Sequence, residues 1–261
     1  MDKRICVIVP TYNNIKTVTD VVERLLPFGY PIIVVNDGST DDTEGLIVHL
    51  IEEKKKTSPS ADITLVSYIQ NQGKGHALRT GFRKAIEKGF DYGVTIDSDG
   101  QHYPEDIVKL VQTLNDELER MKGRHQDGVL VVGNRKLQND NMPGGNTFAN
   151  YFSNFWFMLQ TWQYLPDTQT GYRIYPLHRL HGLNWLTARY EAELELLVFA
   201  AWNGVKLVSC PIRVYYPPQG ERITHFRPIY DFIRITILNT ILCFLCIYGW
   251  PKMLVNKIMR L

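Results

Sequence analysis

Short apolar runs rich in β-branched residues alternate with amphipathic stretches through the first half of the chain. The runs have the length and composition of strands that are buried on both faces. The stretches between them carry apolar residues three and four positions apart, as helices with one buried face do. The runs predicted as strands are residues 5–9, 31–35, 63–69, 92–96 and 128–133. This alternation predicts an α/β fold with a mostly parallel sheet and helices on both of its faces.

Polar segments that contain glycine or asparagine follow four of these runs. They are residues 10–14, 36–42, 71–76 and 97–102. Ligands of parallel sheets bind beyond the carboxyl ends of the strands, where such segments converge. We therefore expect the four loops to form one site.

Asp97 and Asp99 stand at the end of the fourth run. Residues two apart in an extended segment point the same way, so two carboxylates can converge on one cation. Gln101 adds a third oxygen on that side, and hard oxygen ligands of this kind favour Mg²⁺ or Mn²⁺. Taken alone, the pattern also fits a polar turn or a helix cap. Its place beside the other loops favours the metal site.

Two further loop residues are candidates for binding a ligand. Asp37 is the first acid after the second run and can accept hydrogen bonds from a ribose or a base, with turn and cap bonds as the alternative. Lys74 lies between two glycines in NQGKG, which indicates an anion-binding loop or a tight turn before a helix. The spacing of a P-loop is absent.

The second half of the chain is less regular. Arg135 ends the fifth run and is placed to meet an anionic group. Glu191, Glu193 and Glu195 open a predicted helix, where acidic residues also stabilise the helix dipole. Glu193 points away from the other two, so the three cannot all serve one site. Residues 220–227, GERITHFR, form a basic loop that suits a phosphate headgroup or else a solvated linker.

The composition narrows the classes of partner. Of 261 residues, 44% are hydrophobic and 21% are charged, as in an ordinary globular protein. The net charge of +2 lacks the dominance of basic residues that nucleic-acid binding calls for, so no nucleic-acid partner is expected. Cys243 and Cys246 have the spacing of a redox or metal pair, but they lie in an apolar run with no second pair and no nearby His. Nothing suggests a disulfide framework, which favours a reducing, cytoplasmic compartment.

The last part of the chain has a different character. Residues 235–251, ITILNTILCFLCIYGWP, are at the lower length limit for a bilayer span. An interfacial helix or a docking hairpin fits as well, and a buried helix of a soluble protein is the alternative. No signal peptide is expected, because the chain starts directly with a strand run. We predict a domain of residues 1–227 and a C-terminal membrane-associated helical segment, residues 228–261, at the cytoplasmic face of a membrane.

Four motifs in this order, VIVPTYNN, VVNDGSTDDT, NQGKGHALRTGF and TIDSDGQH, resemble the family 2 glycosyltransferases of the GT-A fold. The similarity covers about residues 4–216. Two later segments, DTQTGYRIYP and RYEAELELL, resemble the dolichol- and polyprenol-phosphate sugar transferase branch of that family. The resemblance implies a GT-A type, Rossmann-like sheet, a nucleoside-diphosphate sugar as donor, a divalent metal, and C-terminal helices in or across the membrane.

The resemblance also implies roles for individual residues. The expected donor-site residues are Pro10, Tyr12, Asn14, Asp37, Lys74, Asp97 and Ser98. The expected metal ligands are Asp97, Asp99 and Gln101. The expected catalytic residues are Asp99, Arg135, which would contact an acceptor phosphate, and Glu193 or Glu195 near the reacting sugar.

The expected reaction transfers one sugar, with inversion, to a lipid phosphate. Two departures from the branch concern the acceptor: QNDNMPGGNTFAN lacks a second arginine, and residues 221–225 read ERITH in place of a Gly-x-Ser-Lys pattern. The alternative is a saccharide or other hydroxyl acceptor in cell-envelope glycan or glycolipid synthesis, for which Glu193 or Glu195 would be the base. A nucleotidyltransferase and a non-catalytic membrane adaptor are more distant alternatives.

Overall fold

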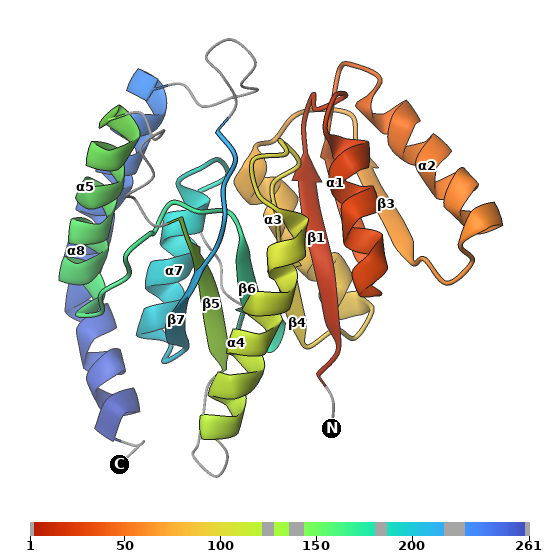
Figure 1. Ribbon diagram of the computed structural model, residues 1–261. Coiled ribbons are helices and arrows are strands. Elements are labelled where there is room, and N and C mark those ends of the chain that lie inside the picture. Colours follow the sequence, from red (N-terminus) through yellow and green to blue (C-terminus); the bar gives the residue numbers. More distant parts are fainter. Residues whose placement is uncertain (1–2, 122–127, 136–143, 181–186, 217–227, 259–261) are drawn as a thin grey trace.

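The computed structural model describes residues 3–121, 128–135, 144–180, 187–216 and 228–258. Its centre is a seven-stranded sheet with the order β3-β2-β1-β4-β6-β5-β7 (Figure 1). The strands are β1 (Ile5–Thr11), β2 (Ile32–Asp37), β3 (Ile63–Tyr68), β4 (Tyr92–Thr95), β5 (Val129–Asn134), β6 (Arg173–Pro176) and β7 (Lys206–Pro211). The five strands predicted from the apolar runs are confirmed as β1 to β5.

In this sheet only β6 runs against the others, antiparallel to both β4 and β5, whereas the remaining pairs are parallel. The predicted α/β fold with a mostly parallel sheet is therefore confirmed, with one reversed strand inside it. The reversal brings the amino end of β6 to the edge where β1, β2, β4 and β5 have their carboxyl ends. Loops before β6 and loops after the parallel strands consequently meet at one edge.

Helices cover both faces of the sheet. They are α1 (Val18–Leu25), α2 (Thr43–Thr57), α3 (Lys74–Glu87), α4 (Ile107–Arg120), α5 (Gly144–Thr161), α6 (Leu177–Leu180), α7 (Ala192–Trp202) and α8 (Pro228–Ile258), with short turns η1 (Leu26–Phe28) and η2 (Pro104–Asp106). In β1, Cys6 and Ile8 pack into the core cluster of α3 and α7, while Val7 and Val9 pack into that of α1 and α4. Burial on both faces explains why the strand runs contain so few polar residues.

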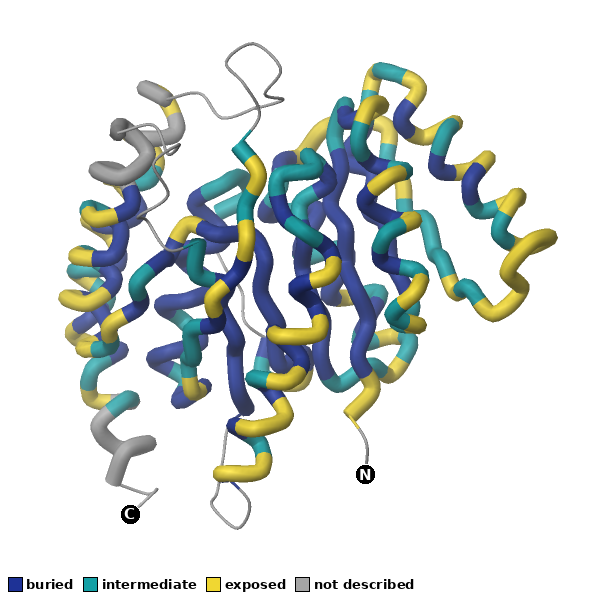
Figure 2. Tube along the Cα trace, viewed as in Figure 1, coloured by how far each residue is buried: buried dark blue, intermediate teal, exposed yellow. Residues whose placement is uncertain are grey.

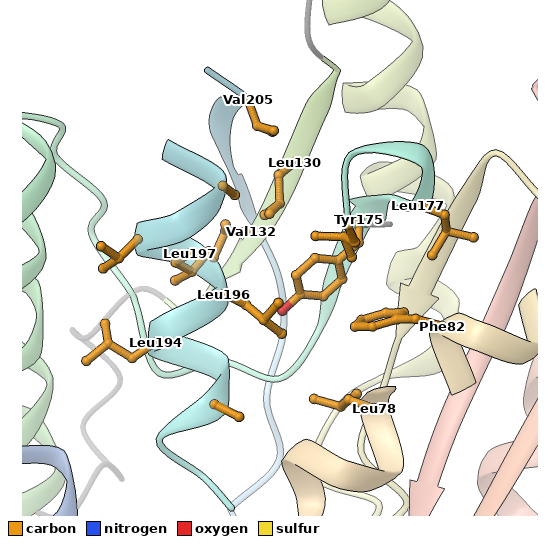
Figure 3. Packing of buried hydrophobic residues seen from close by; sticks show 14 of the residues in the cluster. Leu78, Phe82, Leu130, Val132, Tyr175, Leu177, Leu194, Leu196, Leu197 and Val205 are labelled. Carbon is orange, nitrogen blue, oxygen red and sulfur yellow. The ribbon is translucent and has the colours of Figure 1, made fainter. Parts of the chain in front are cut away.

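One of the two core clusters joins the two halves of the sheet. Phe82 of α3 meets Tyr175 of β6 edge to face, with 5.0 Å between the ring centres (Figure 3). Leu196 and Leu197 of α7 belong to the same cluster, and all of these side chains are buried. Helices α3 and α7 are thereby fixed side by side under the loops that follow the strands.

Helix α8 lies beside α5, at the end of the molecule farthest from α2 (Figure 1). Its inner residues Leu238, Leu242 and Cys246 belong to the same core cluster as α3 and α7. Its outer residues are exposed, as Figure 2 shows for both α5 and α8. The predicted C-terminal membrane-associated helices correspond, within the described residues, to this one apolar helix, and the division of the chain at residue 227 stays a prediction.

The contact between α5 and α8 has a polar centre at Gln160. Its side-chain amide donates to Oδ1 of Asn239 at 3.0 Å. Its backbone carbonyl accepts from the indole nitrogens of Trp202 at 2.9 Å and Trp250 at 3.0 Å. Because this carbonyl lies near the end of α5, the two indoles satisfy an oxygen that the helix itself would leave unpaired.

Candidate active site

The first two loops after the strands are bound to each other through asparagine side chains. Asn13 accepts from the backbone N–H of Thr40 at 2.8 Å, and its own N–H donates to the Ser39 hydroxyl at 3.0 Å. Asn14 donates to the Ser98 hydroxyl at 2.6 Å, and both residues are buried. The structure thus brings Asn14 and Ser98 together at the predicted site, where each is already paired with the other.

Asp37 closes the third loop. Its two carboxylate oxygens accept hydrogen bonds from the backbone N–H groups of Gln72 at 2.8 Å and Gly73 at 2.9 Å, and from the Asn71 amide at 3.0 Å. Burial raises the pKa of Asp37, and these donors oppose the rise. These bonds tie Asp37 to the loop before α3, whereas the turn-and-cap alternative concerned the next helix along the chain, α2. Pro10 is buried at the end of β1, and Tyr12 is partly exposed beside it. The nucleotide-binding role of Pro10, Tyr12 and Asp37 stays a prediction.

The glycines around Lys74 make room for the chain itself. A Cβ at Gly73 would lie 2.6 Å from the carbonyl oxygen of Ala188, and one at Gly75 would lie 2.4 Å from Cβ of Ala192. The start of α3 is therefore packed tightly against the start of α7. The glycines accordingly have a packing role, whether or not this loop also binds an anion.

Lys74 forms two ion pairs inside this junction. Its ammonium nitrogen is 2.7 Å from Oδ1 of Asp97 and 2.9 Å from Oε2 of Glu193. Burial alone would lower the pKa of Lys74, but the two carboxylates raise it well above its usual value. For Asp97, burial would raise the pKa, and Lys74 and the other nearby cations hold it below the usual range. Lys74 and Asp97 are therefore both charged at neutral pH.

Asp97 and Asp99 occupy one turn after β4. Oδ1 of Asp99 accepts from the backbone N–H of Gln101 at 2.9 Å, which closes the turn. Among the described residues, no group of three or more His, Cys, Asp or Glu side chains forms a complete metal cage. Two carboxylates on one turn nevertheless fit a Mg²⁺ or Mn²⁺ ion whose other ligands are water and substrate phosphates.

His102 is buried next to this turn. Its Nδ1 has no hydrogen-bond partner within the described part of the chain. Burial lowers the pKa of His102 to about 4, although Asp97 opposes this shift. The ring is therefore neutral at physiological pH.

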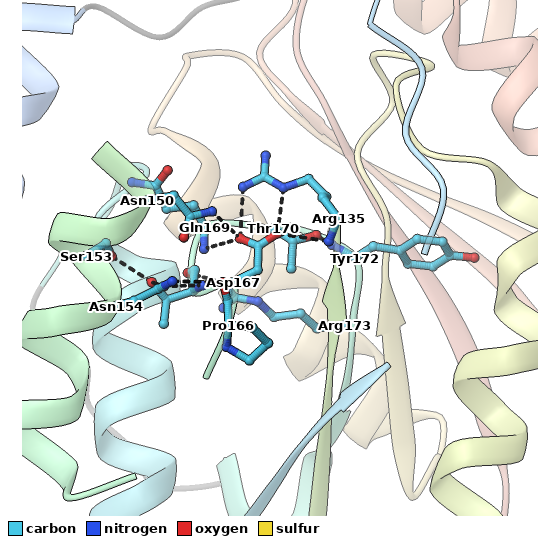
Figure 4. A network of polar contacts seen from close by, with 11 residues as sticks. Arg135, Asn150, Ser153, Asn154, Pro166, Asp167, Gln169, Thr170, Tyr172 and Arg173 are labelled. Atoms are coloured by element: carbon cyan, nitrogen blue, oxygen red, sulfur yellow. Dashed lines mark hydrogen bonds and ion pairs between the residues drawn. The ribbon is translucent and has the colours of Figure 1, made fainter. Parts of the chain in front are cut away.

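Arg135 is held by a carboxylate that the sequence analysis did not single out. Its Nε and Nη2 donate to the two oxygens of Asp167 at 2.7 and 2.9 Å, a bidentate ion pair (Figure 4). The Asp167 side chain is fully buried and that of Arg135 is 16% exposed. Asn150 of α5 donates to Oδ1 of Asp167 at 2.8 Å. No residue in the described ranges accepts a hydrogen bond from the third guanidinium nitrogen, Nη1.

The three glutamates at the start of α7, of which Glu191 is the residue just before the helix, have three different partners. Glu193 meets Lys74, and its other oxygen is buried without a hydrogen bond from the described residues. Glu195 accepts from the hydroxyl of Thr187 at 2.6 Å and from its N–H at 3.0 Å. Glu191 accepts from Arg234 of α8 at 3.1 Å. Of the two predicted candidates, Glu193 is thus the one that lies against Lys74 and Asp97, while Glu195 binds the segment before α7.

Arg173, at the start of β6, was missed by the sequence analysis. It is fully buried, and it donates to the backbone carbonyls of Glu193 and Thr168, each at 2.8 Å. Burial would lower the pKa of Arg173, but nearby Tyr175 and Glu193 raise it, so the guanidinium stays charged. Arg173 therefore ties the loop that carries Asp167 to the first turn of α7. In the sequence, the polar turn DTQTGYR was the only sign of this role of Arg173. The basic loop of residues 220–227, predicted to suit a phosphate headgroup, lies outside the described ranges.

Comparison with known proteins identifies the family of the chain. The chain matches the family described as glycosyl transferase family 2 over residues 6–174. It is 34% identical over 229 residues to the UDP-N-acetylglucosamine--dolichyl-phosphate N-acetylglucosaminyltransferase of Methanococcus voltae, covering 82% of this chain and 87% of that protein. It is 26% identical to the undecaprenyl-phosphate mannosyltransferase of Micrococcus luteus, covering 84% and 86%.

Solved structures support the fold. A crystal structure of S. aureus TarS in complex with UDP has a TM-score of 0.53 at 19% sequence identity, covering 92% of this chain and 65% of that one. GalNAc-T7, crystallised with UDP, GalNAc and Mn²⁺, has a TM-score of 0.50 at 15% identity, covering 90% and 48%. The family match extends over more than half of the chain and spans the loops that form the site. The chain is an enzyme of glycosyl transferase family 2.

Proposed function

We propose that this glycosyltransferase moves one sugar from a nucleoside-diphosphate donor, with inversion and a divalent metal, to a membrane lipid phosphate of the polyprenyl or dolichyl type. The observation that carries the proposal is Arg135, a mostly buried cation that is fixed by Asp167 and lies close enough to Asp97 to feel its charge. Nε and Nη2 of this arginine are held by Asp167, so a phosphate group would be bound through the remaining N–H groups of the guanidinium. The names of the M. voltae and M. luteus relatives, which refer to dolichyl and undecaprenyl phosphate, support the same acceptor class.

Asp97 and Asp99 are the proposed metal ligands, with Gln101 as a further ligand. A bound divalent cation would supply positive charge to the departing diphosphate. The tasks of the chain are to hold the two carboxylates on one turn and to keep the loops of Asn14 and Asp37 closed beside them. Pro10, Tyr12 and Asp37 are the proposed nucleotide-pocket residues, and Ser98 positions Asn14.

A phosphate acceptor is already ionised at neutral pH and needs no strong base. Arg135 would orient it, with its fork fixed by Asp167. A hydroxyl acceptor would instead need a base, and Glu193 is the candidate because it lies against Lys74 and Asp97. Oε2 of Glu193 is engaged by Lys74 and Oε1 is buried, an arrangement that favours the phosphate acceptor.

The proposed place of action is the cytoplasmic face of a membrane. Residues Ile233–Pro251 of α8 form a helix long and apolar enough to cross a bilayer, with a mean hydropathy of 1.6. The exposed large apolar residues of α5 and α8, which we call the apolar face, are Tyr151, Phe155, Met158, Leu159, Tyr230, Ile233, Ile237, Ile241, Phe244, Ile247 and Tyr248. The apolar face includes α5, whose Asn150 binds Asp167, the partner of Arg135. An exposed apolar surface of this kind supports a lipid-bound acceptor.

The test is to incubate the purified protein with Mn²⁺ and a panel of nucleotide sugars, beginning with UDP-N-acetylglucosamine, with and without polyprenyl or dolichyl phosphate. We expect nucleoside diphosphate release that requires one donor and the lipid together, with the sugar recovered on the lipid. Donor turnover that is indifferent to the lipid but rises with a saccharide acceptor would contradict the lipid-phosphate proposal. It would also make Glu193→Gln the next variant to measure.

A further inference from the structure

The ammonium group of Lys74 already occupies one of the two carboxylates proposed to bind metal. It lies 2.7 Å from Oδ1 of Asp97, closer than to Glu193 at 2.9 Å. The contact is tightly enclosed, since a Cβ at Gly171 would lie 2.5 Å from Oδ2 of Asp97 and 2.9 Å from the Lys74 ammonium. The packing of Gly73 and Gly75 against the 188–192 segment fixes the root of the lysine. Lys74 is therefore held at Asp97 by the fold.

The charges behind this contact are balanced before any ligand arrives. The carboxylates of Asp97, Glu193 and Asp167 are matched in number by the cations Lys74, Arg135 and Arg173. A divalent cation that approached this turn would meet the Lys74 ammonium at close range, and the carboxylate of Asp99 would offset only one of its two positive charges. The repulsion is large in a partly buried site, where the effective dielectric constant is far below that of water. A donor diphosphate brings the negative charge that removes this excess.

We propose that Lys74 is the resident counter-ion of Asp97, and that metal and donor displace it together, Lys74 then pairing with Glu193 and the diphosphate. The proposal rests on the proposed metal-binding role of Asp97. Lys74 would thus couple the two binding events: metal binds weakly to the free enzyme and tightly in the presence of nucleotide. The coupling is reciprocal, so nucleotide also binds more tightly when metal is present.

A permanent structural role is the competing explanation of the same contacts. In that case Lys74 would stay on Asp97 throughout the reaction, and its removal would lower stability without any gain in metal affinity. The two explanations predict opposite effects on metal binding by the free enzyme, which makes them separable without an activity assay.

The experiment measures Mn²⁺ binding to the full chain by the loss of the free-ion signal in electron paramagnetic resonance, with and without UDP or GDP. We expect Lys74→Met and Lys74→Gln to bind Mn²⁺ at least about tenfold more tightly than wild type when nucleotide is absent, because one cation next to Asp97 is gone. We expect the enhancement of Mn²⁺ binding by nucleotide to shrink in both variants. The glutamine variant keeps a hydrogen-bond donor near the carboxylates and guards against a folding defect in the methionine variant.

Glu193→Gln is the matched control at the other end of the pair. It leaves Lys74 with Asp97 as its single carboxylate partner among the described residues, so Mn²⁺ binding without nucleotide should be unchanged or weaker. If a folded Lys74 variant binds Mn²⁺ no more tightly than wild type, while wild type binds it with nucleotide, the counter-ion proposal is wrong and the metal site stands. If no variant binds Mn²⁺ even with nucleotide, the metal-binding role of Asp97 fails as well.

Discussion

Arg135 and Asp167 form a buried ion pair that orients the guanidinium but adds little net free energy to the stability of the fold. Two charges removed from water gain little net free energy from their attraction, whereas removing one partner leaves the other uncompensated. Asn150 adds a further donor to Asp167, so the carboxylate is well satisfied. The pair therefore fixes the direction of the guanidinium. Removing one of the two partners should lower the free energy of unfolding by a measurable amount.

We expect Asp167→Asn to lower the free energy of unfolding at neutral pH by about 3–5 kcal/mol, because Arg135 would keep a buried charge without a counter-ion. Burial would raise the pKa of Asp167, but Arg135 outweighs it and lowers the pKa below the usual range. Its charge therefore stabilises the fold above the unfolded-state pKa of about 3.9 and is lost as pH falls through the lower folded-state pKa.

Denaturant unfolding at several pH values checks this prediction. The difference between wild type and variant should be full near neutral pH and should shrink only below about pH 4. Asp20→Asn is the control, since Asp20 forms an exposed ion pair with Arg24 on one helix and should contribute about 0.5 kcal/mol or less. Equal effects of the two substitutions would show that the Asp167 pair is not buried as described.

Asp99, the second carboxylate of the turn after β4, gives a prediction for activity. We expect Asp99→Ala to lower kcat by about 100-fold or more while the thermal unfolding curve stays close to that of wild type, because a ligand for the departing diphosphate's cation is removed. Asp116→Ala, an exposed acid of α4, is the control and should leave kcat unchanged. Full turnover by a folded Asp99→Ala enzyme would exclude the metal role of this residue.

At the scale of elements, α5 has two sides with different tasks. Its inner side carries Asn150, which supports Asp167, and Asn154, which donates to the carbonyl of Pro166 at 2.8 Å and accepts from the N–H of Thr168 at 3.0 Å. Its outer side belongs to the apolar face. One helix therefore joins the proposed acceptor-phosphate residue to the surface proposed to meet lipid.

The apolar face can be tested directly with vesicles of phospholipid. We expect the double substitution Phe244→Ser and Ile247→Ser to reduce cosedimentation with vesicles at least tenfold, since full burial of each large apolar side chain contributes about 1.5–3 kcal/mol. Both residues are well exposed, so the fold should tolerate the change. The control replaces Ile69 and Val108, exposed apolar residues outside the apolar face, by serine. An equal loss of binding in both double variants would exclude a specific role for α8.

At the scale of the whole molecule, the sequence predicted β1 to β5, because continuous apolar runs mark these strands. It did not predict β7, the edge strand parallel to β5, which is only partly buried. Nor did it predict β6, a strand of four residues that begins with the buried Arg173. The sequence also indicated Lys74 as a site residue but did not predict its ion pairs. Glu193 comes near Lys74 only because α3 packs on α7. Loop positions follow from strand order, whereas ion pairs between distant segments depend on how the helices pack.

The Gln160 junction has a consequence for any attempt to make a soluble form of this enzyme. Cutting the chain before Pro228 would remove the partners of the Gln160 side chain and one of the two indoles on its carbonyl. It would also uncover Trp202, against which Gly249 packs so closely that a Cβ there would lie 2.4 Å from the ring. Helix α8 is thus packed into the core of the described structure, and removing it would expose that core. Detergent or lipid should preserve the native enzyme where truncation would open its core.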